Sequence, residues 1–117
     1  MEGFFACYYE GVEKMMCLMS LALGASPILS DYPKEAEEIT QLASALVLNT
    51  GTINSNSARA MLLAGKTANK KGIPVVLDPV GVGATSYRKE IINKCVSCHY
   101  ARTGLCRWNC LWLESTP

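Results

Sequence analysis

The sequence predicts an α/β fold in which parallel strands alternate with helices in three layers, α/β/α. Two short apolar runs, at 45–49 and 74–78, each end in a polar or glycine-bearing turn, and a helix-length segment separates them. A strand–helix–strand unit of this size favours two parallel strands joined by a right-handed crossover. Because both runs are apolar throughout rather than alternating, we expect helices on both faces of the sheet.

The first element before this unit is an amphipathic helix over about 33–44. Asp31 is a candidate N-cap, and Pro33 suits the first helical turn. The glutamates that follow favour the positive end of the helix dipole. One stripe of the helix is apolar and consists of Ala36, Ile39, Leu42 and Ala43.

The strand–helix–strand unit has clear local signals at each boundary. The first strand ends in Asn49-Thr50-Gly51-Thr52, and Asn54 or Ser55 then caps a helix over 55–71 that ends at Gly72. The second strand is expected at 74–78. We find no such pattern in residues 1–19 or 95–117, which predicts a domain over 20–94 between two divergent segments.

Length and composition limit the function classes. A chain of 117 residues that is 50% hydrophobic and 18% charged suits one soluble domain. Its net charge of +1 gives no electrostatic argument for nucleic acid or for a membrane surface. No apolar run is long enough to span a bilayer, and the first ten residues hold Glu2 and Glu10 but no lysine or arginine. We expect a cytoplasmic protein.

The turns after the two strands are the candidate functional site. Parallel neighbours end at the same edge of a sheet, so Asn49 and Asp78 should lie close together. Their oxygens, with backbone N–H groups at Gly81 and Gly83, suit a phosphorylated or hydroxylated small ligand with Mg²⁺. The alternative is that the glycines only make tight turns and Asp78 only caps one. Ser86 stands where a dinucleotide fingerprint needs its third glycine.

The cysteines allow two other sites. Cys95-Val-Ser-Cys98-His99 matches the pattern of covalent haem attachment, which requires export, whereas His99 alone is more typical of an incidental histidine. Cys95 and Cys98 with Cys106 and Cys110 could instead bind zinc, although the spacing of the second pair matches poorly.

Four segments in succession carry a family resemblance. They are Leu21–Ile28, Ala45–Thr52, Ala60–Lys66 and Gly72–Thr85, the last containing Asp-Pro-Val-Gly-Val-Gly-Ala-Thr. Together they resemble hydroxyethylthiazole kinase, a thiamine-salvage family of the ribokinase-like superfamily, from about 21 to 93. The resemblance implies a partial ribokinase-like fold.

The resemblance also implies an activity and its cofactors. Such enzymes transfer the γ-phosphate of ATP to the alcohol of 4-methyl-5-(2-hydroxyethyl)thiazole with Mg²⁺, and they form trimers with the thiazole site between subunits. Asp78 matches the acidic residue near the metal, and Gly81, Gly83 and Thr85 match the phosphate loop. Leu29 stands where the family usually has a methionine that contacts the thiazole. The implied substrate-binding residues are Leu29, Asn49, Gly51, Thr52, Pro79, Val80 and Gly81.

The chain also departs from the family pattern. The N-terminal segment that shapes the thiazole pocket is not recognisable in 1–19. After Asn93 the ATP-binding Arg-Gly-Asn segment and the glycine-rich anion hole are not recognisable either, so we assign no catalytic residue. Loss of one such backbone donor typically costs about 10²–10³ in rate. We therefore expect a truncated or frameshifted fragment with little activity alone. The alternative is a non-catalytic binding or interaction protein that keeps half the fold, with a zinc-binding tail.

Overall fold

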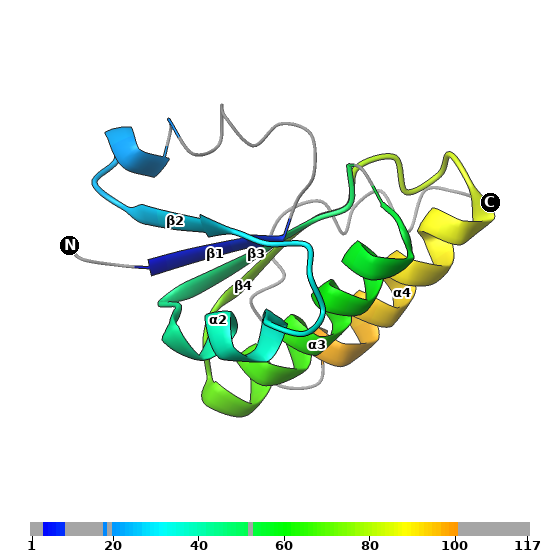
Figure 1. Ribbon diagram of the computed structural model, residues 1–117. Coiled ribbons are helices and arrows are strands. Elements are labelled where there is room, and N and C mark those ends of the chain that lie inside the picture. The colour runs from blue at the N-terminus through cyan, green and yellow to red at the C-terminus, as the bar shows by residue number, and fades with distance from the viewer. Residues whose placement is uncertain (1–3, 9–17, 19, 52, 101–117) are drawn as a thin grey trace.

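A four-stranded parallel sheet forms the centre of the molecule. The computed structural model describes residues 4–8, 18, 20–51 and 53–100. Strands β1 (Phe4–Tyr8), β2 (Ser26–Leu29), β3 (Ala45–Asn49) and β4 (Val75–Asp78) lie in the order β2-β1-β3-β4 (Figure 1). All three pairings are parallel. The predicted α/β class with parallel strands is confirmed, and the bounds predicted for β3 are those observed.

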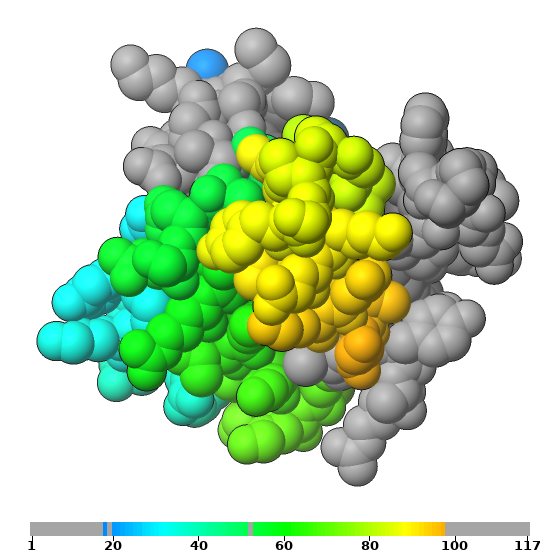
Figure 2. All heavy atoms as spheres, turned by 90° about the vertical axis from the view of Figure 1, so that its right-hand side faces the viewer, coloured from blue at the N-terminus to red at the C-terminus, as the bar shows by residue number. Residues whose placement is uncertain are grey.

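Three helices lie on one side of this sheet, namely α2 (Ala36–Leu42), α3 (Ser55–Lys71) and α4 (Ser86–Tyr100) (Figure 1). From β2 to β3 and from β3 to β4 the chain moves in the same direction across the sheet. Right-handed crossovers therefore place α2 and α3 on the same face. Figure 2 shows α4 packed along α3 on the outside of this layer.

The core lies between the sheet and these helices. Leu46 and Leu48 of β3 are fully buried and stand beside Val75 and Leu77 of β4 in the register of the sheet. The helices contribute mainly small residues, so α3 packs close to the strands; buried members are Ala58, Ala60, Met61, Ala64 and Ala68. Val76 points the other way and is 53% exposed. The helical layer expected on that second face is not formed by α2, α3 or α4.

The predicted bounds of α3 are confirmed, and its ends explain why. The Asn54 side chain accepts hydrogen bonds from the backbone N–H groups of Asn56 and Ser57, each at 2.9 Å. The Ser57 hydroxyl accepts from the Asn54 N–H at 2.9 Å, which completes a reciprocal capping box. Gly72 ends the helix with a left-handed φ of 71°.

The expectation for α2 was wrong at its start. The helix begins at Ala36, with Glu35 at the N-cap position, rather than at 33, and Asp31 does not cap it. The Ser30 hydroxyl instead donates to the Glu35 carboxylate and accepts from the Tyr32 N–H at 3.3 Å. These bonds hold residues 30–35 as a turn, which delays the first helical residue.

Three elements of the described chain were not predicted, namely β1, β2 and α4. β1 is a central strand between β2 and β3, and β2 precedes the α2 turn. α4 continues through position 95, where we expected the domain to end, up to Tyr100. Cys95 of α4 is fully buried in the same core as Leu46, so α4 belongs to the domain on both sides of that expected boundary.

Candidate functional site

The carboxyl edge of the sheet contains a reversal in strand order. From β1 the chain goes to β2 on one side, whereas β3 and then β4 lie on the other side. In open α/β sheets, ligands bind outside the carboxyl ends of the strands at such a switch point. Tyr8 at the end of β1 stands beside Leu48 in the register, one residue before the end of β3. Asn49 therefore lies next to the switch point.

Asn49 and Asp78 meet at this edge, as the sequence predicted. They are register partners, and the Asn49 side-chain Nδ2 donates to Asp78 Oδ2 at 2.8 Å. The other end of the same amide, Oδ1, accepts from the Gly51 N–H at 2.7 Å. The NH₂ group and the oxygen of the Asn49 amide therefore both have hydrogen-bond partners in the same orientation: the NH₂ donates to the carboxylate, and the oxygen accepts from a backbone N–H. Asn49 is only 7% exposed, so this orientation is held by packing as well.

Thr50 adds further bonds between the two loops. Its backbone N–H donates to the Asp78 carbonyl at 3.2 Å, and its buried hydroxyl donates to the Val80 carbonyl at 3.2 Å. We did not predict Thr50 as a site residue. Its position between Asn49 and Gly51 was the only sequence signal for a role at this site. The acceptors of its hydrogen bonds are main-chain carbonyls, which every residue type carries.

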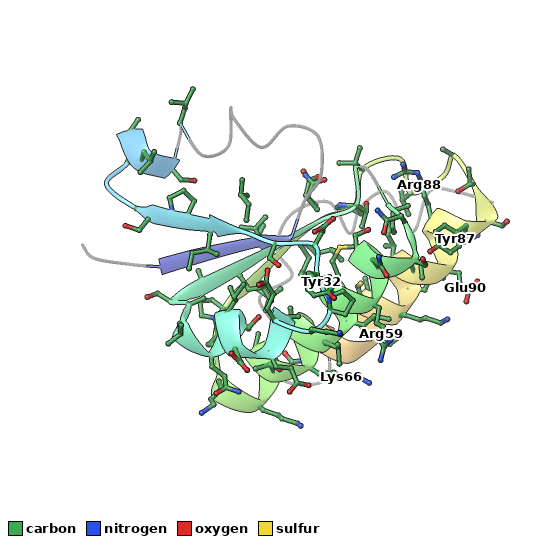
Figure 3. The ribbon with its side chains drawn as sticks, viewed as in Figure 1. Tyr32, Arg59, Lys66, Tyr87, Arg88 and Glu90 are labelled. Carbon is green, nitrogen blue, oxygen red and sulfur yellow. The ribbon has the colours of Figure 1, made fainter. Side chains whose placement is uncertain are left out.

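Arg88 is the second residue that we did not predict. It comes from the first turn of α4, and its guanidinium donates to the carbonyls of Thr50, Gly51 (2.8 Å) and Val80 (3.1 Å). Figure 3 shows Arg88 at the end of the molecule where the strand-end loops lie, whereas Arg59 lies along α3. The loops after β3 and β4 are therefore joined by side chains from three elements.

The Asp78 carboxylate meets one requirement of a magnesium ligand. It is half-buried, and within the described residues only its Oδ2 has a hydrogen-bond partner. Mg²⁺ in phosphoryl-transfer sites binds one or two carboxylates and fills its other positions with water and phosphate oxygens. One free carboxylate oxygen is compatible with that chemistry. No group of three or more His, Cys, Asp or Glu residues in the described part of the chain could hold a metal by itself.

The loop after β4 is a series of turns that leads into α4. Gly81 has a left-handed φ of 67°, which favours glycine, whereas Gly83 is not among the glycines with positive φ. The Ala84 N–H donates to the Gly81 carbonyl at 2.9 Å. The Thr85 hydroxyl accepts from the Arg88 N–H at 3.1 Å, so it caps α4.

The other predicted substrate residues are distributed along the same edge. Pro79 is half-buried and Val80 is 42% exposed, both directly after Asp78. Leu29 ends β2 and is half-buried, but β1 separates it from Asn49. Thr52 lies outside the described residues. The structure thus brings Asn49, Gly51, Asp78, Val80 and Gly81 together and leaves Leu29 two strands away.

The cysteine sites considered above receive no support from Cys95. Cys95 is fully buried in the core, so a zinc or haem site that used its sulfur would have to take the side chain out of that core. Cys106 and Cys110 lie outside the described residues, as do the side chains of Cys98 and His99.

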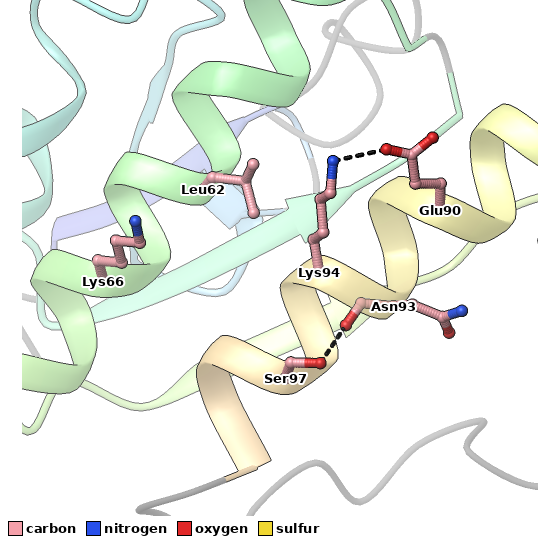
Figure 4. A pocket seen from close by; sticks show the side chains of 6 residues that line it. All are labelled: Leu62, Lys66, Glu90, Asn93, Lys94 and Ser97. Atoms are coloured by element: carbon pink, nitrogen blue, oxygen red, sulfur yellow. Dashed lines mark hydrogen bonds and ion pairs between the residues drawn. The ribbon is translucent and has the colours of Figure 1, made fainter.

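A hollow of about 440 Å³ lies between α3 and α4, away from the strand-end loops (Figure 4). Its lining residues are Leu62, Lys66, Glu90, Asn93, Lys94 and Ser97. Lys94 Nζ lies 2.6 Å from Glu90 Oε1, and this hydrogen bond, with the attraction of the carboxylate charge, raises the pKa of Lys94. The pair is exposed to solvent, and no residue of the Asn49–Asp78 cluster lines this hollow.

Comparison with known proteins decides the family. Residues 12–111 match the sequence model of the hydroxyethylthiazole kinase family. The chain belongs to this family. The match confirms the resemblance and extends it beyond 21–93 at both ends.

Two similar curated relatives are hydroxyethylthiazole kinases. The one from Alkaliphilus metalliredigens is 58% identical over 63% of this chain, and the one from Lysinibacillus sphaericus is 59% identical over 62% of it. The chain covers 27% and 29% of their respective lengths.

A solved structure supports the partial fold. The hydroxyethylthiazole kinase protein from Pyrococcus horikoshii matches 82% of this chain with a TM-score of 0.78 and 38% identity. This chain covers 38% of that one. The predicted partial ribokinase-like fold is therefore confirmed. In the part of the chain that the structure describes, no helix is both long and apolar enough to cross a membrane.

Proposed function

We propose that this chain forms one wall of an active site for ATP-dependent phosphorylation of 4-methyl-5-(2-hydroxyethyl)thiazole, with Mg²⁺. The observation that carries the proposal is the Asn49–Asp78 hydrogen bond at the carboxyl edge of the sheet, beside the switch point, in a chain of this family. Phosphoryl transfer depends on positioning and on stabilising charge. A rigid strand-end cluster with one available carboxylate oxygen suits that task.

Each group in the cluster has a proposed role. Asp78 is a metal-facing carboxylate, and the hydrogen bond from Asn49 fixes its orientation. Gly81 and Gly83 present backbone to the phosphates without a Cβ in the way. Bound Mg²⁺ would supply charge neutralisation for the phosphate oxygens. Asn49 and Gly51, with the Pro79–Val80 turn, form the adjoining surface for the thiazole alcohol.

The thiazole side of this site is incomplete within one described chain. Leu29 and Asn49 lie at the same sheet edge but with β1 between them. We infer a homo-oligomer, a trimer by family resemblance, in which a second copy completes the thiazole pocket. Sedimentation of the purified chain with and without hydroxyethylthiazole tests this. A monomer in both conditions contradicts the inference.

The proposed function is tested first by binding, because the chain covers less than a third of the length of the curated kinases. Hydroxyethylthiazole and Mg²⁺·ADP are titrated into the purified chain by calorimetry, followed by an assay for phosphorylated thiazole with ATP. We expect binding of both ligands and low turnover. Failure of the folded chain to bind either ligand contradicts the proposal and favours the non-catalytic interaction protein.

Asp78→Asn separates the metal role from the structural one. The amide oxygen of asparagine can still accept from Asn49, so the loop bond is kept while the carboxylate charge is lost. We expect the gain in ADP affinity on adding Mg²⁺ to disappear. Asp31→Asn, a substitution of the same chemistry in the turn before α2, should leave that gain unchanged. An equal gain in the Asp78→Asn variant would contradict the assignment.

A further inference from the structure

Arg88 holds two loops with one guanidinium group. One of its nitrogens, Nη1, donates to the carbonyl of Thr50 and to that of Val80 at 3.1 Å, and Nη2 donates to the carbonyl of Gly51 at 2.8 Å. Thr50 and Gly51 belong to the loop after β3, whereas Val80 belongs to the loop after β4. A single rigid group therefore spans the gap between the two strand-end loops.

The chemistry of arginine suits this task better than that of lysine. A guanidinium is planar and carries several N–H donors in a fixed fork, whereas an ammonium donates from a single atom. Arg88 makes no ion pair with a carboxylate of the described residues, so main-chain carbonyls are its partners there. Hydrogen bonds from a charged donor are roughly twice as strong as neutral ones.

The surroundings of Arg88 fix the guanidinium in turn. Its backbone N–H donates to the Thr85 hydroxyl at 3.1 Å, which anchors the residue in the first turn of α4. The Arg88 Cδ would lie 3.5 Å from a Cβ built on Gly81, so its aliphatic stem packs beside the turn in the β4 loop. The side chain is half-buried. The position of the guanidinium is thus restricted by hydrogen bonds to both loops and by packing of the stem beside the loop after β4.

We propose that Arg88 is a positioning residue that holds the loop after β3 and the loop after β4 in one fixed arrangement. It acts through the main chain of Gly51 and Val80 rather than by touching a ligand. Gly51 lies two residues after Asn49, and Val80 lies two residues after Asp78. What the two loops bind rests on the proposed function. The hydrogen bonds from Arg88 to the two loops, which we call the Arg88 tie, do not depend on it, because they join groups of this chain.

Amide hydrogen exchange tests the tie without any ligand. The Thr50 N–H and the Val80 N–H both bond to the Asp78 carbonyl, and the Gly51 N–H bonds to Asn49. In Arg88→Met we expect exchange at these three amides to rise about 10- to 100-fold, the scale of bonds to a charged group. Arg88→Lys should resemble Arg88→Met. Amides in the middle of α3 should change less than about twofold, which separates local loosening from global unfolding.

Arg59→Met is the matched control, because Arg59 is an exposed arginine on α3. It should leave exchange in both loops unchanged. Unchanged loop exchange in Arg88→Met would overturn the inference. So would an equal rise throughout the chain, because Arg88 would then contribute only to overall stability.

Ligand binding by the folded variants gives the functional readout. Where the unmodified chain binds hydroxyethylthiazole, we expect Arg88→Met to weaken it about tenfold or more, and millimolar ethylguanidinium to restore part of it in Arg88→Ala. Unchanged affinity in Arg88→Met with loosened loops would make Arg88 merely structural and overturn the positioning role. Absence of binding by the unmodified chain contradicts the proposed function, whereas the exchange pattern decides the tie by itself.

Discussion

Asn49 and Asp78 are 29 residues apart in the chain, yet their side chains are joined by a 2.8 Å hydrogen bond at the ends of neighbouring strands. The bond is one of several across the same gap. Thr50 contributes its N–H and hydroxyl, and Arg88 contributes its guanidinium. The carboxyl edge of β3 and β4 therefore behaves as one hydrogen-bonded unit, whose members can be removed one at a time.

Asn49→Ala is expected to destabilise this unit. It leaves the Gly51 N–H and the Asp78 Oδ2 without the partners they have now, and part-buried groups left unsatisfied cost about 1–3 kcal/mol. The measurement is the free energy of unfolding by urea. Asn93→Ala, an exposed asparagine in α4, is the control and should change it by less than about 0.5 kcal/mol. Equal effects of the two substitutions would show that the Asn49 bonds do not stabilise the fold.

The β3–α3–β4 unit could be predicted because its signals are local. Asn54 caps α3, Gly72 ends it, and the strands on either side are short apolar runs. Each of these signals depends on residues that lie close together in sequence. The meeting of Asn49 and Asp78 then followed from the rule that parallel neighbours end at one edge.

The parts of the fold and of the site that could not be predicted depend on contacts between residues that are distant in the chain. β1 is a strand because it pairs with β2 and β3, and these partners are remote in the chain. In α4 the buried residues Ile91, Ile92 and Cys95 are interspersed with exposed polar ones, which weakens its amphipathic pattern. Arg88 could not be predicted as a site residue because its partners are carbonyl groups, and every residue type carries one.

Leu48→Ala tests where the core lies. Leu48 is fully buried beneath the helices, and such truncations cost about 2–5 kcal/mol through lost apolar burial and the cavity left behind. The control is Val76→Thr in β4, because Val76 lies on the opposite face of the sheet and is 53% exposed. We expect that change to stay within about 0.5 kcal/mol of the unmodified chain. Chemical denaturation measures both. A large effect at Val76 would show that its face is covered in solution.

Glu90→Gln tests the ion pair beside the hollow between α3 and α4. The hydrogen bond with Glu90 raises the pKa of Lys94 above its ordinary value of 10.5, so the substitution should lower that pKa. A lysine with a raised folded-state pKa stabilises the fold below its unfolded pKa, and this stabilisation is lost as pH rises through the folded value. The stabilising effect should therefore be present below pH 10.5 and be lost at higher pH. It should also be weak, because both side chains are more than half exposed.

The Lys94 titration is followed by NMR in the unmodified chain and in Glu90→Gln. Glu37→Gln on α2 is the control, since Glu37 is not a partner of Lys94. It should leave the Lys94 pKa where it is. A Lys94 pKa that does not fall in Glu90→Gln would mean that the pair is not formed in solution.

The two glycines of the loop after β4 should respond differently to the same substitution. Gly81 has a φ of 67°, where an added Cβ strains the backbone, and that Cβ would also meet the Arg88 stem at 3.5 Å. Gly81→Ala should therefore cost about 1–2 kcal/mol in unfolding free energy and also loosen the loop that Arg88 holds. Gly83→Ala is the matched control and should be tolerated within about 0.5 kcal/mol, because Gly83 does not have a positive φ. If Gly83→Ala nevertheless weakens Mg²⁺·ADP binding while leaving stability unchanged, the role of Gly83 is to let the ligand approach the backbone. Equal tolerance at both positions in stability and binding would contradict the phosphate-loop assignment and leave the turn with a purely structural role.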